Sequence, residues 1–335
     1  MSKRILVTGA TGFTGSHILE SLMQDGSVTP IAACRNPNSL LPGFKGESRP
    51  GDLRDPDYVE SVVKDIDVIC HAAAWTSLWN HHQQSRENYL EPTLHLIEAA
   101  KKCGVKQFVF PSTTSAAAPG QSFDPLSRGI PRTFWPHLCN VIAIEDELRK
   151  AAGPGFSTVI LRLGLFTGKR YGLGILPILL PRLKTHLVPW VAGGRTHLPL
   201  VDGSDIGHAF LLAIKAKALQ DHECFNIVGI EQPTVREVIE FIHLEYNYPT
   251  PHFSVPFSIA YPFAWLMEKL DPVVPWEPLV TRSIIHLQEE THANNDKART
   301  LLGYQSAIHW KESVRSQIEE LHQLQREAMP MAAEQ

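Results

Sequence analysis

The sequence predicts an α/β protein with a doubly wound parallel sheet and a smaller C-terminal substrate-binding domain. Two observations support this prediction. Residues 5–7 are an apolar strand that runs into a glycine-rich turn, after which residues 16–23 have the pattern of an amphipathic helix. From there to about residue 168, strand-like apolar runs alternate with helical patterns, as a parallel sheet with crossover helices requires.

The turn at residues 8–15 reads T-G-x-x-G-x-x-G. Gly9 can adopt a positive φ, Gly12 lets the backbone approach a pyrophosphate, and Gly15 lets the helix pack close to the strand. The phosphates would lie at the helix N-terminus, where unpaired N–H groups and the dipole favour an anion. Any α/β protein can have a glycine-rich loop, but the strand before and the helix after it favour a Rossmann-type dinucleotide site.

Composition narrows the class of protein. The chain has 335 residues and a net charge of −4 with mixed signs, so it carries no basic field for nucleic acid. Its five cysteines form no CxxC pair, and no long apolar span precedes the first strand. We therefore expect a cytoplasmic protein. No HExxH or Cys/His cluster is present in the sequence, so no metal site is expected.

The end of the second strand, at residues 29–34, bears on the choice of cofactor. An acidic side chain there would hold the ribose 2′-hydroxyl of NAD, but residues 27–46 contain no Asp or Glu. Arg35 follows the strand directly and suits a 2′-phosphate. The sequence favours NADP, with NAD as the alternative if Arg35 only solvates a loop. Asp55 and Pro56 can begin the next helix, which leaves Asp52 free for the adenosine.

Several motifs together resemble the extended short-chain dehydrogenase/reductase family, in its NAD-dependent epimerase/dehydratase and hydroxysteroid dehydrogenase-like branch. Besides TGATGFTG, residues 51–55 resemble its adenine-contact segment and residues 71–74 its fourth-strand motif. Residues 88–100 resemble its long fourth helix. Residues 162–168 resemble its R-P-G-x-x-x-G, with Leu163 in place of the proline. The resemblance spans roughly residues 1–310.

The motifs and the resemblance together imply a set of site residues. Those expected to bind the cofactor are Gly9, Thr11, Gly12, Phe13, Gly15, Arg35, Asp52, Leu53, Ala72, Ala73 and Leu163. The family places a catalytic Ser or Thr two or three residues past the apolar run of the fifth strand, which is expected at residues 107–114, and Thr113 fills that position. The alternative is that its hydroxyl only caps the strand end. The resemblance also implies that Asn88, at the start of a helix, assists catalysis.

The family's Tyr-x-x-x-Lys pair is missing. Pro136 and Glu145 fix the register, so His137 takes the tyrosine position and Val141 the lysine position. None of the seven tyrosines has lysine four residues later. Valine cannot lower a neighbouring pKa or bind the ribose. Histidine, with an ordinary pKa near 6.5, could donate a proton by itself, although a buried helix histidine can also be purely structural.

Beyond residue 170 the chain leaves the repeating pattern. The apolar segments 175–191 and 251–270 are either a lid over an apolar substrate or the core of the small domain, and prolines 256 and 262 argue against a membrane span. If they form a lid, they should line a water-poor cleft together with Trp75 and Trp79. Residues 311–327 are expected to form a charged amphipathic helix and residues 328–335 a frayed tail.

The expected dinucleotide domain comprises residues 1–168 and about 198–230, and the substrate domain about 169–197 and 231–310. The expected function is that of an NAD(P)-binding enzyme acting on a small apolar hydroxy or oxo compound, with His137 and Thr113 replacing the usual pair. Two alternatives remain open. One is a non-redox cyclase, lyase or isomerase that retains the nucleotide structurally, and the other is a nucleotide-sensing regulator. A homodimer is allowed, whereas nucleic acid is not an expected partner.

Overall fold

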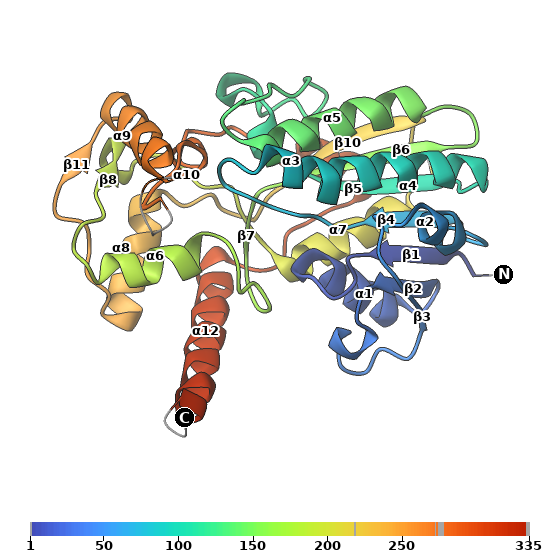
Figure 1. Ribbon diagram of the computed structural model, residues 1–335, viewed down its shortest axis with the longest axis horizontal. Helices are drawn as coiled ribbons and strands as arrows, with labels where there is room; N and C mark the ends of the chain where they lie inside the picture. Colours follow the sequence, from blue (N-terminus) through green and yellow to red (C-terminus); the bar gives the residue numbers. More distant parts are fainter. Residues whose placement is uncertain (1, 218, 272, 274–277, 333–335) are drawn as a thin grey trace.

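The computed structural model describes residues 2–217, 219–271, 273 and 278–332. Its centre is a parallel sheet of seven strands in the order β10-β6-β5-β4-β1-β2-β3 (Figure 1). The strands are β1 (Arg4–Thr8), β2 (Thr29–Cys34), β3 (Glu47–Pro50), β4 (Val68–His71), β5 (Gln107–Thr113), β6 (Ser157–Leu163) and β10 (His222–Ile227). The order reverses between β1 and β4, and in such sheets ligands bind in the crevice at the carboxyl ends of those strands.

Helices cover both faces of the sheet because successive strand residues point to opposite sides. In β1, Ile5 and Val7 belong to one core and Leu6 to the other, and all three are fully buried. The first core includes α1 (Phe13–Asp25), α7 (Gly203–Lys215) and α11 (Asp296–Leu302). The second includes α2 (Pro56–Val62), α4 (Glu91–Lys102) and α5 (Pro136–Ala151). The prediction of a doubly wound Rossmann-type sheet is therefore confirmed.

The strand positions expected from the sequence agree with β2, β5 and β6 to within about one residue. Asp55 caps α2 by accepting a hydrogen bond from the Asp57 amide, with Pro56 in the first turn, as predicted. Helix α1 starts earlier than expected, at Phe13, because Gly12 itself occupies the N-cap position.

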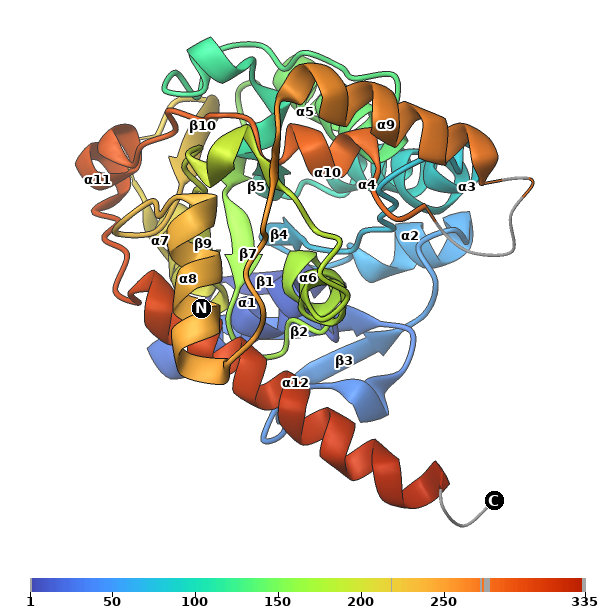
Figure 2. The ribbon, with the colours of Figure 1, turned by 90° about the vertical axis from the view of Figure 1, so that its left-hand side faces the viewer.

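A second group of elements lies beyond the carboxyl edge of the sheet, seen end-on in Figure 2. It contains α6 (Ile175–Leu183), α8 (Val235–Tyr246), α9 (Phe257–Leu270), α10 (Arg282–His286), and the pair β8 (Trp190–Val191) with β11 (Ser254–Val255). Between it and the sheet lie β7 (Leu165–Thr167) and β9 (Leu200–Asp202). His286 of α10 forms a hydrogen bond through Nε2 to the Ser115 carbonyl at 3.3 Å, which links this second group of elements to the segment that follows β5.

The C-terminal helix α12 (Trp310–Ala332) extends further than predicted. Residues 328–332, expected to be a frayed tail, continue the helix. Pro330 lies within this stretch, so local helix propensity does not explain the extension. Residues 333–335 of the expected tail lie outside the described residues.

Close packing fixes the glycine turn. Gly9 has φ +63°, and a Cβ there would lie 2.6 Å from the Cα of Ala73. A Cβ on Gly15 would collide with the carbonyl oxygen of Gly9. At Gly12, by contrast, a Cβ would meet only that same oxygen, at 3.3 Å. Gly9 and Gly15 therefore hold β1, α1 and β4 together, while Gly12 is exposed at the start of α1.

We predict that Gly15→Ala lowers the free energy of unfolding by about 1–3 kcal/mol, because a rigid backbone atom must move to admit the methyl group. Gly153→Ala is the matched control, since nothing lies within 4 Å of a Cβ there. It should change stability by less than about 0.5 kcal/mol. Urea unfolding followed by circular dichroism measures both, and equal midpoints for the two variants would contradict the packing argument.

Candidate functional site

A cavity of about 120 Å³ opens at the switch point of the sheet. It lies where β4 and β5 end, beside the first turns of α1 and α5. Its lining residues are Thr14, His71, Ala72, Ala73, Ala74, Thr76, Tyr89, Pro111, Ser112, Thr113, His137, Val141 and Phe166. None of these described residues is Asp, Glu, Lys or Arg. The cavity is thus bounded by small apolar groups, hydroxyls and two imidazoles.

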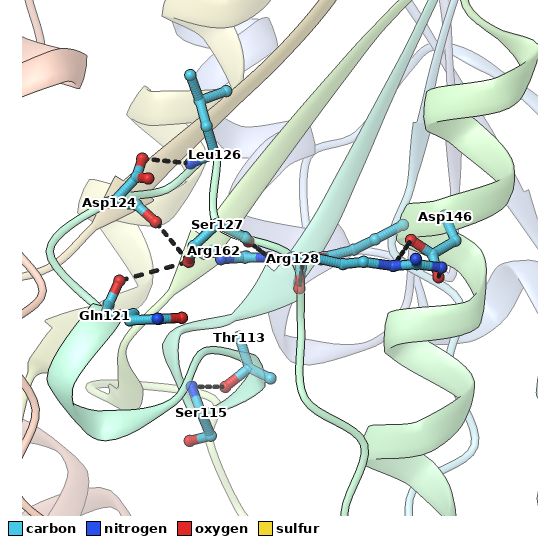
Figure 3. Close-up of polar contacts among 11 residues, drawn as sticks. Thr113, Ser115, Gln121, Asp124, Leu126, Ser127, Arg128, Asp146 and Arg162 are labelled. Carbon is cyan, nitrogen blue, oxygen red and sulfur yellow. Dashed lines mark hydrogen bonds and ion pairs between the residues drawn. The ribbon is translucent and has the colours of Figure 1, made fainter.

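The structure brings His137 and Thr113 together on this cavity, as the sequence suggested. Val141 lies on the same wall, one helical turn after His137, and is 3% exposed. The Thr113 hydroxyl accepts a hydrogen bond from the Ser115 amide at 3.2 Å (Figure 3). It therefore caps the short helix after β5 and keeps its own hydrogen for another acceptor.

Burial changes the chemistry expected of His137. It lowers the pKa of the imidazole to about 4, and the backbone carbonyl of Trp75 opposes this only in part. Nδ1 is buried and has no hydrogen-bond partner among the described residues. With the Trp75 carbonyl as acceptor, the hydrogen belongs on Nε2 and Nδ1 keeps its lone pair. The expectation of a proton donor with an ordinary pKa near 6.5 is therefore wrong, since at neutral pH the ring is an uncharged hydrogen-bonding group.

A buried ion pair supports the floor of the site. Glu145 of α5 accepts hydrogen bonds from Arg162 of β6 at 2.7 and 2.9 Å, and both side chains are almost fully buried. The Ser112 hydroxyl donates to the same carboxylate at 2.5 Å. Ser112 thus gives its hydrogen to Glu145 and can offer only lone pairs to the cavity.

The loop between β5 and α5 is held against this ion pair (Figure 3). Arg162 donates to the Ser127 carbonyl at 2.8 Å, and Arg128 pairs with Asp146 of α5 at 2.7 Å. Asp124 accepts from the Leu126 amide at 2.9 Å. Arg162 therefore links β6, α5 and the loop, and these contacts anchor the segment that leads into the first turn of α5, where His137 lies.

A second buried chain of hydrogen bonds runs behind the cavity. The Thr93 hydroxyl donates to the Tyr89 carbonyl at 2.7 Å, so it must accept from His71 Nε2, 2.9 Å away. His71 Nδ1 is then the acceptor for the Thr8 hydroxyl at 2.8 Å, and Thr8 in turn accepts from the Ala73 amide at 3.3 Å. Burial lowers the pKa of His71 to about 3, which keeps this tautomer neutral.

Asn88 does not reach the cavity. The helix that contains it begins earlier than predicted, with α3 (His82–Ser85), and passes through a π-helical turn at Arg86–Leu90 before α4. Asn88 contacts the Gln84 carbonyl at 2.8 Å and Arg54 at 3.2 Å, on the side of the cofactor's expected adenosine end. The next residue, Tyr89, lines the cavity instead. No motif pointed to Tyr89, although a π turn is often found at functional sites.

The residues expected at the adenosine end lie at the same sheet edge. Arg35 follows β2 and is exposed, and it contributes to lowering the pKa of Asp52. The largest cause of that lowering, to about 2, is the hydrogen bonds from Arg54, at 2.6–3.1 Å. Asp52 is therefore already paired. Leu53 is partly buried against the second core.

Phe13 and Leu163 were also expected to contact the cofactor, but both side chains pack against the protein. Phe13 stacks near Phe166 and Tyr171, with ring centroids 5.3 and 4.6 Å away. Leu163 is fully buried in the first core and is not among the cavity residues.

The apolar blocks of the second half do not line this cavity, so the first of their two expected roles, a lid lining it, is wrong. Leu176, Leu180 and Trp190 pack with α8 and α12 in a core of their own. Along α9, Ile259, Phe263 and other large side chains are exposed. Trp75 and Trp79 are also outside the cavity lining, and Trp79 donates to Asp271 at 3.3 Å. The first block thus buries its apolar side chains in that core, whereas α9 buries only Ala260 and Ala264.

The first turn of α1 fits a dinucleotide phosphate. It has no side-chain cap and no acidic residue, so its amides stay available to an anion. The described residues hold no group of three or more His, Cys, Asp or Glu side chains suited to a metal ion. No helix among them is long and apolar enough to span a membrane.

Comparison with known proteins identifies the family. The model of the NAD dependent epimerase/dehydratase family matches residues 5–228. The chain belongs to this family. It is similar to sterol-4-alpha-carboxylate 3-dehydrogenase, decarboxylating, from Dictyostelium discoideum, at 23% identity over 93% of this chain and 99% of that protein. A ketoreductase of a 4-farnesyl dihydroquinoline oxide from Stigmatella aurantiaca is 25% identical over 91% of this chain and 92% of its own.

Solved structures of the same family share the fold. UDP-glucuronic acid 4-epimerase from Bacillus cereus, in complex with NAD, superposes with a TM-score of 0.73 at 20% identity, covering 96% of this chain and 99% of its own. The resemblance to extended short-chain dehydrogenases is thereby confirmed, and so is the family's class of cofactor, a nicotinamide dinucleotide.

We predict that His137 titrates with a midpoint near pH 4. Because the pKa is lower in the folded state than the value of about 6.5 in an unfolded chain, its contribution to stability is complete above pH 6.5. That contribution is lost as the pH falls from 6.5 towards 4. Proton NMR of the imidazole, assigned with His137→Gln, measures the midpoint. Titration near 6.5 would show that the ring is not desolvated as described.

Proposed function

We propose that this chain is an NAD(P)-dependent reductase of a small apolar oxo compound, which it binds in the uncharged cavity beside Thr113 and His137. The observation that carries the proposal is the position of that cavity, at the switch point between the glycine turn and the ends of β4 and β5. The similar proteins named for a sterol substrate and a farnesylated quinoline support an apolar compound.

Two groups of residues would act in this function, one that binds the nucleotide and one that contacts the substrate. The amides of the first turn of α1 hold the phosphates, and Gly12 lets them approach. When bound, a reduced nicotinamide supplies a hydride to the carbonyl carbon of the substrate. Thr113 can donate a hydrogen bond to the substrate oxygen, and the lone pair of His137 Nδ1 can accept one from a hydroxyl group.

We further propose the domain division expected from the sequence, with residues 1–168 and about 198–230 binding the nucleotide. Residues 169–197 and 231–310 would form the substrate domain, with 311–335 as a C-terminal extension. Separate hydrophobic cores support this division: two flank the sheet, and another joins α6, α8 and α12.

A second candidate is a protein that binds the nucleotide without turning it over, either as a non-redox enzyme or as a sensor. Val141 favours it. Val141 is apolar and buried at the position where the family has its lysine. The described residues that line the cavity therefore include no cation that could lower the pKa of an acid or bind the nicotinamide ribose.

Arg35 should set the nucleotide preference. We predict tighter binding of NADPH than of NADH, since the guanidinium can pair with the 2′-phosphate. Arg35→Asp should reverse the preference, because a carboxylate repels the phosphate and accepts from a ribose hydroxyl. Isothermal titration calorimetry with both nucleotides measures this. Equal affinities in the native protein would remove the role of Arg35, and no binding of either would end the proposal.

Restoring the family's pair should raise activity. We predict that His137→Tyr with Val141→Lys increases NADPH-dependent reduction of acetophenone more than the product of the two single effects, because a cation one turn along the helix stabilises the phenolate. His137→Ala should lower the native rate about fivefold to tenfold, the loss of one neutral hydrogen bond. Nucleotide absorbance at 340 nm follows the native protein, the two single variants, the double variant and His137→Ala.

Two results would count against this scheme. An unchanged rate in His137→Ala would remove that residue from the chemistry. If neither the native protein nor the double variant consumed NADPH with any apolar ketone, the binding-only candidate would replace the reductase.

A further inference from the structure

Tyr89 is a phenol placed in the cavity. Its side chain is 3% exposed and belongs to the cavity lining, and its ring centroid lies 5.1 Å from that of His137. Among the described residues its hydroxyl makes no hydrogen bond, in contrast to Tyr58, whose hydroxyl donates to a backbone carbonyl at 2.6 Å. Tyr89 therefore still has a hydrogen to give.

The backbone holds Tyr89 in this orientation. It lies in the π turn Arg86–Leu90, and such a turn accommodates one more residue than an α-helical turn. The Tyr89 carbonyl accepts a hydrogen bond from the Thr93 hydroxyl at 2.7 Å. Through His71 and Thr8 the same chain of hydrogen bonds reaches the end of β1. Tyr89 is thus fixed relative to the glycine turn, where the nucleotide is proposed to bind.

The other polar groups of the cavity are poorer proton donors. Ser112 has committed its hydrogen to Glu145. His137 is uncharged at neutral pH because burial lowers its pKa to about 4. Thr113 has a free hydrogen, but an alcohol is a weaker acid than a phenol. A carbonyl oxygen in this cavity would find its proton on Tyr89.

We propose that Tyr89 is the proton donor of this site and takes over, from a different helix, the task of the tyrosine that is missing at position 137. The proposal rests on the proposed reductase function. As the substrate's carbonyl carbon gains the hydride, the O–H bond of Tyr89 breaks and its proton passes to the carbonyl oxygen, which gives the alcohol. The phenolate left on Tyr89 then regains a proton from water.

The surroundings of Tyr89 suit donation. Burial raises the pKa of its phenol well above the ordinary value near 10, and the charge of Glu145 raises it further. The group is therefore fully protonated at neutral pH, and its phenolate is a strong base that recovers a proton readily. The raised pKa makes the phenol a weaker acid than a free tyrosine, but it remains a stronger acid than the alcohol product and can therefore protonate the developing alkoxide.

The test uses acetophenone labelled with carbon-13 at its carbonyl, bound to the full chain with oxidised nucleotide so that no turnover occurs. Three proteins are compared: native, Tyr89→Phe, which removes only the hydroxyl, and Tyr246→Phe as the matched control on α8. Carbon-13 NMR reports a hydrogen bond to the carbonyl as a downfield shift. In parallel, NADPH oxidation with acetophenone and nucleotide affinity by calorimetry are measured for each protein.

We expect the downfield shift in the native protein and in Tyr246→Phe, and its loss in Tyr89→Phe. The turnover number of Tyr89→Phe should fall about 10²-fold or more, the usual contribution of a positioned acid, with nucleotide affinity unchanged. An equal shift in Tyr89→Phe overturns the proposal, and so does failure of acetophenone to bind the native protein. A shift that depends on Tyr89 without any NADPH oxidation upholds Tyr89 as the donor to the carbonyl and overturns the reductase function instead.

Discussion

β1, α1 and β4 meet at two glycines, Gly9 and Gly15, and this close contact positions the nucleotide-binding turn and the cavity beside it. Because Gly9 has no side chain, the turn rests directly on the backbone of Ala72 and Ala73, and because Gly15 has none, α1 rests on the backbone of Gly9 and Ala10. Those alanines form one wall of the cavity, and the Ala73 amide is bonded to Thr8. The nucleotide-binding turn and the cavity are therefore parts of one rigid contact.

Two buried polar systems extend from that contact, and each fixes a different wall. The Thr8–His71–Thr93 chain is neutral and holds the π turn through a backbone carbonyl. The Glu145–Arg162 pair is charged and holds Ser112 and the loop before α5. Because buried polar groups left without partners are costly, each system specifies one arrangement of the helices around the cavity.

Local sequence patterns predicted the sheet, the glycine turn and the helix cap at Asp55, because each depends on neighbouring residues. The family resemblance, through the register at Pro136 and Glu145, suggested that Thr113 and His137 share one site, and both line the cavity. Local patterns missed Tyr89, because a single extra residue in the π turn barely changes the spacing of apolar residues, yet it turns Asn88 outwards. The sequence also misled about the pKa of His137 and could not decide between a lid and a core for the apolar blocks, since both depend on which segments meet in space.

The direction of the reaction follows from what position 141 lacks. A lysine there would stabilise a phenolate and allow the same acid to act as a base in alcohol oxidation. In this protein the position is apolar, and the charge of the Glu145 carboxylate raises the pKa of the Tyr89 phenol instead of lowering it. To act as a base towards an alcohol, Tyr89 would first have to lose its proton and carry a second negative charge near Glu145. To act as an acid in reduction, it starts from the phenol, the form that its raised pKa favours at neutral pH. On the proposed mechanism, a site of this composition is suited to reducing carbonyl groups and poorly suited to oxidising alcohols.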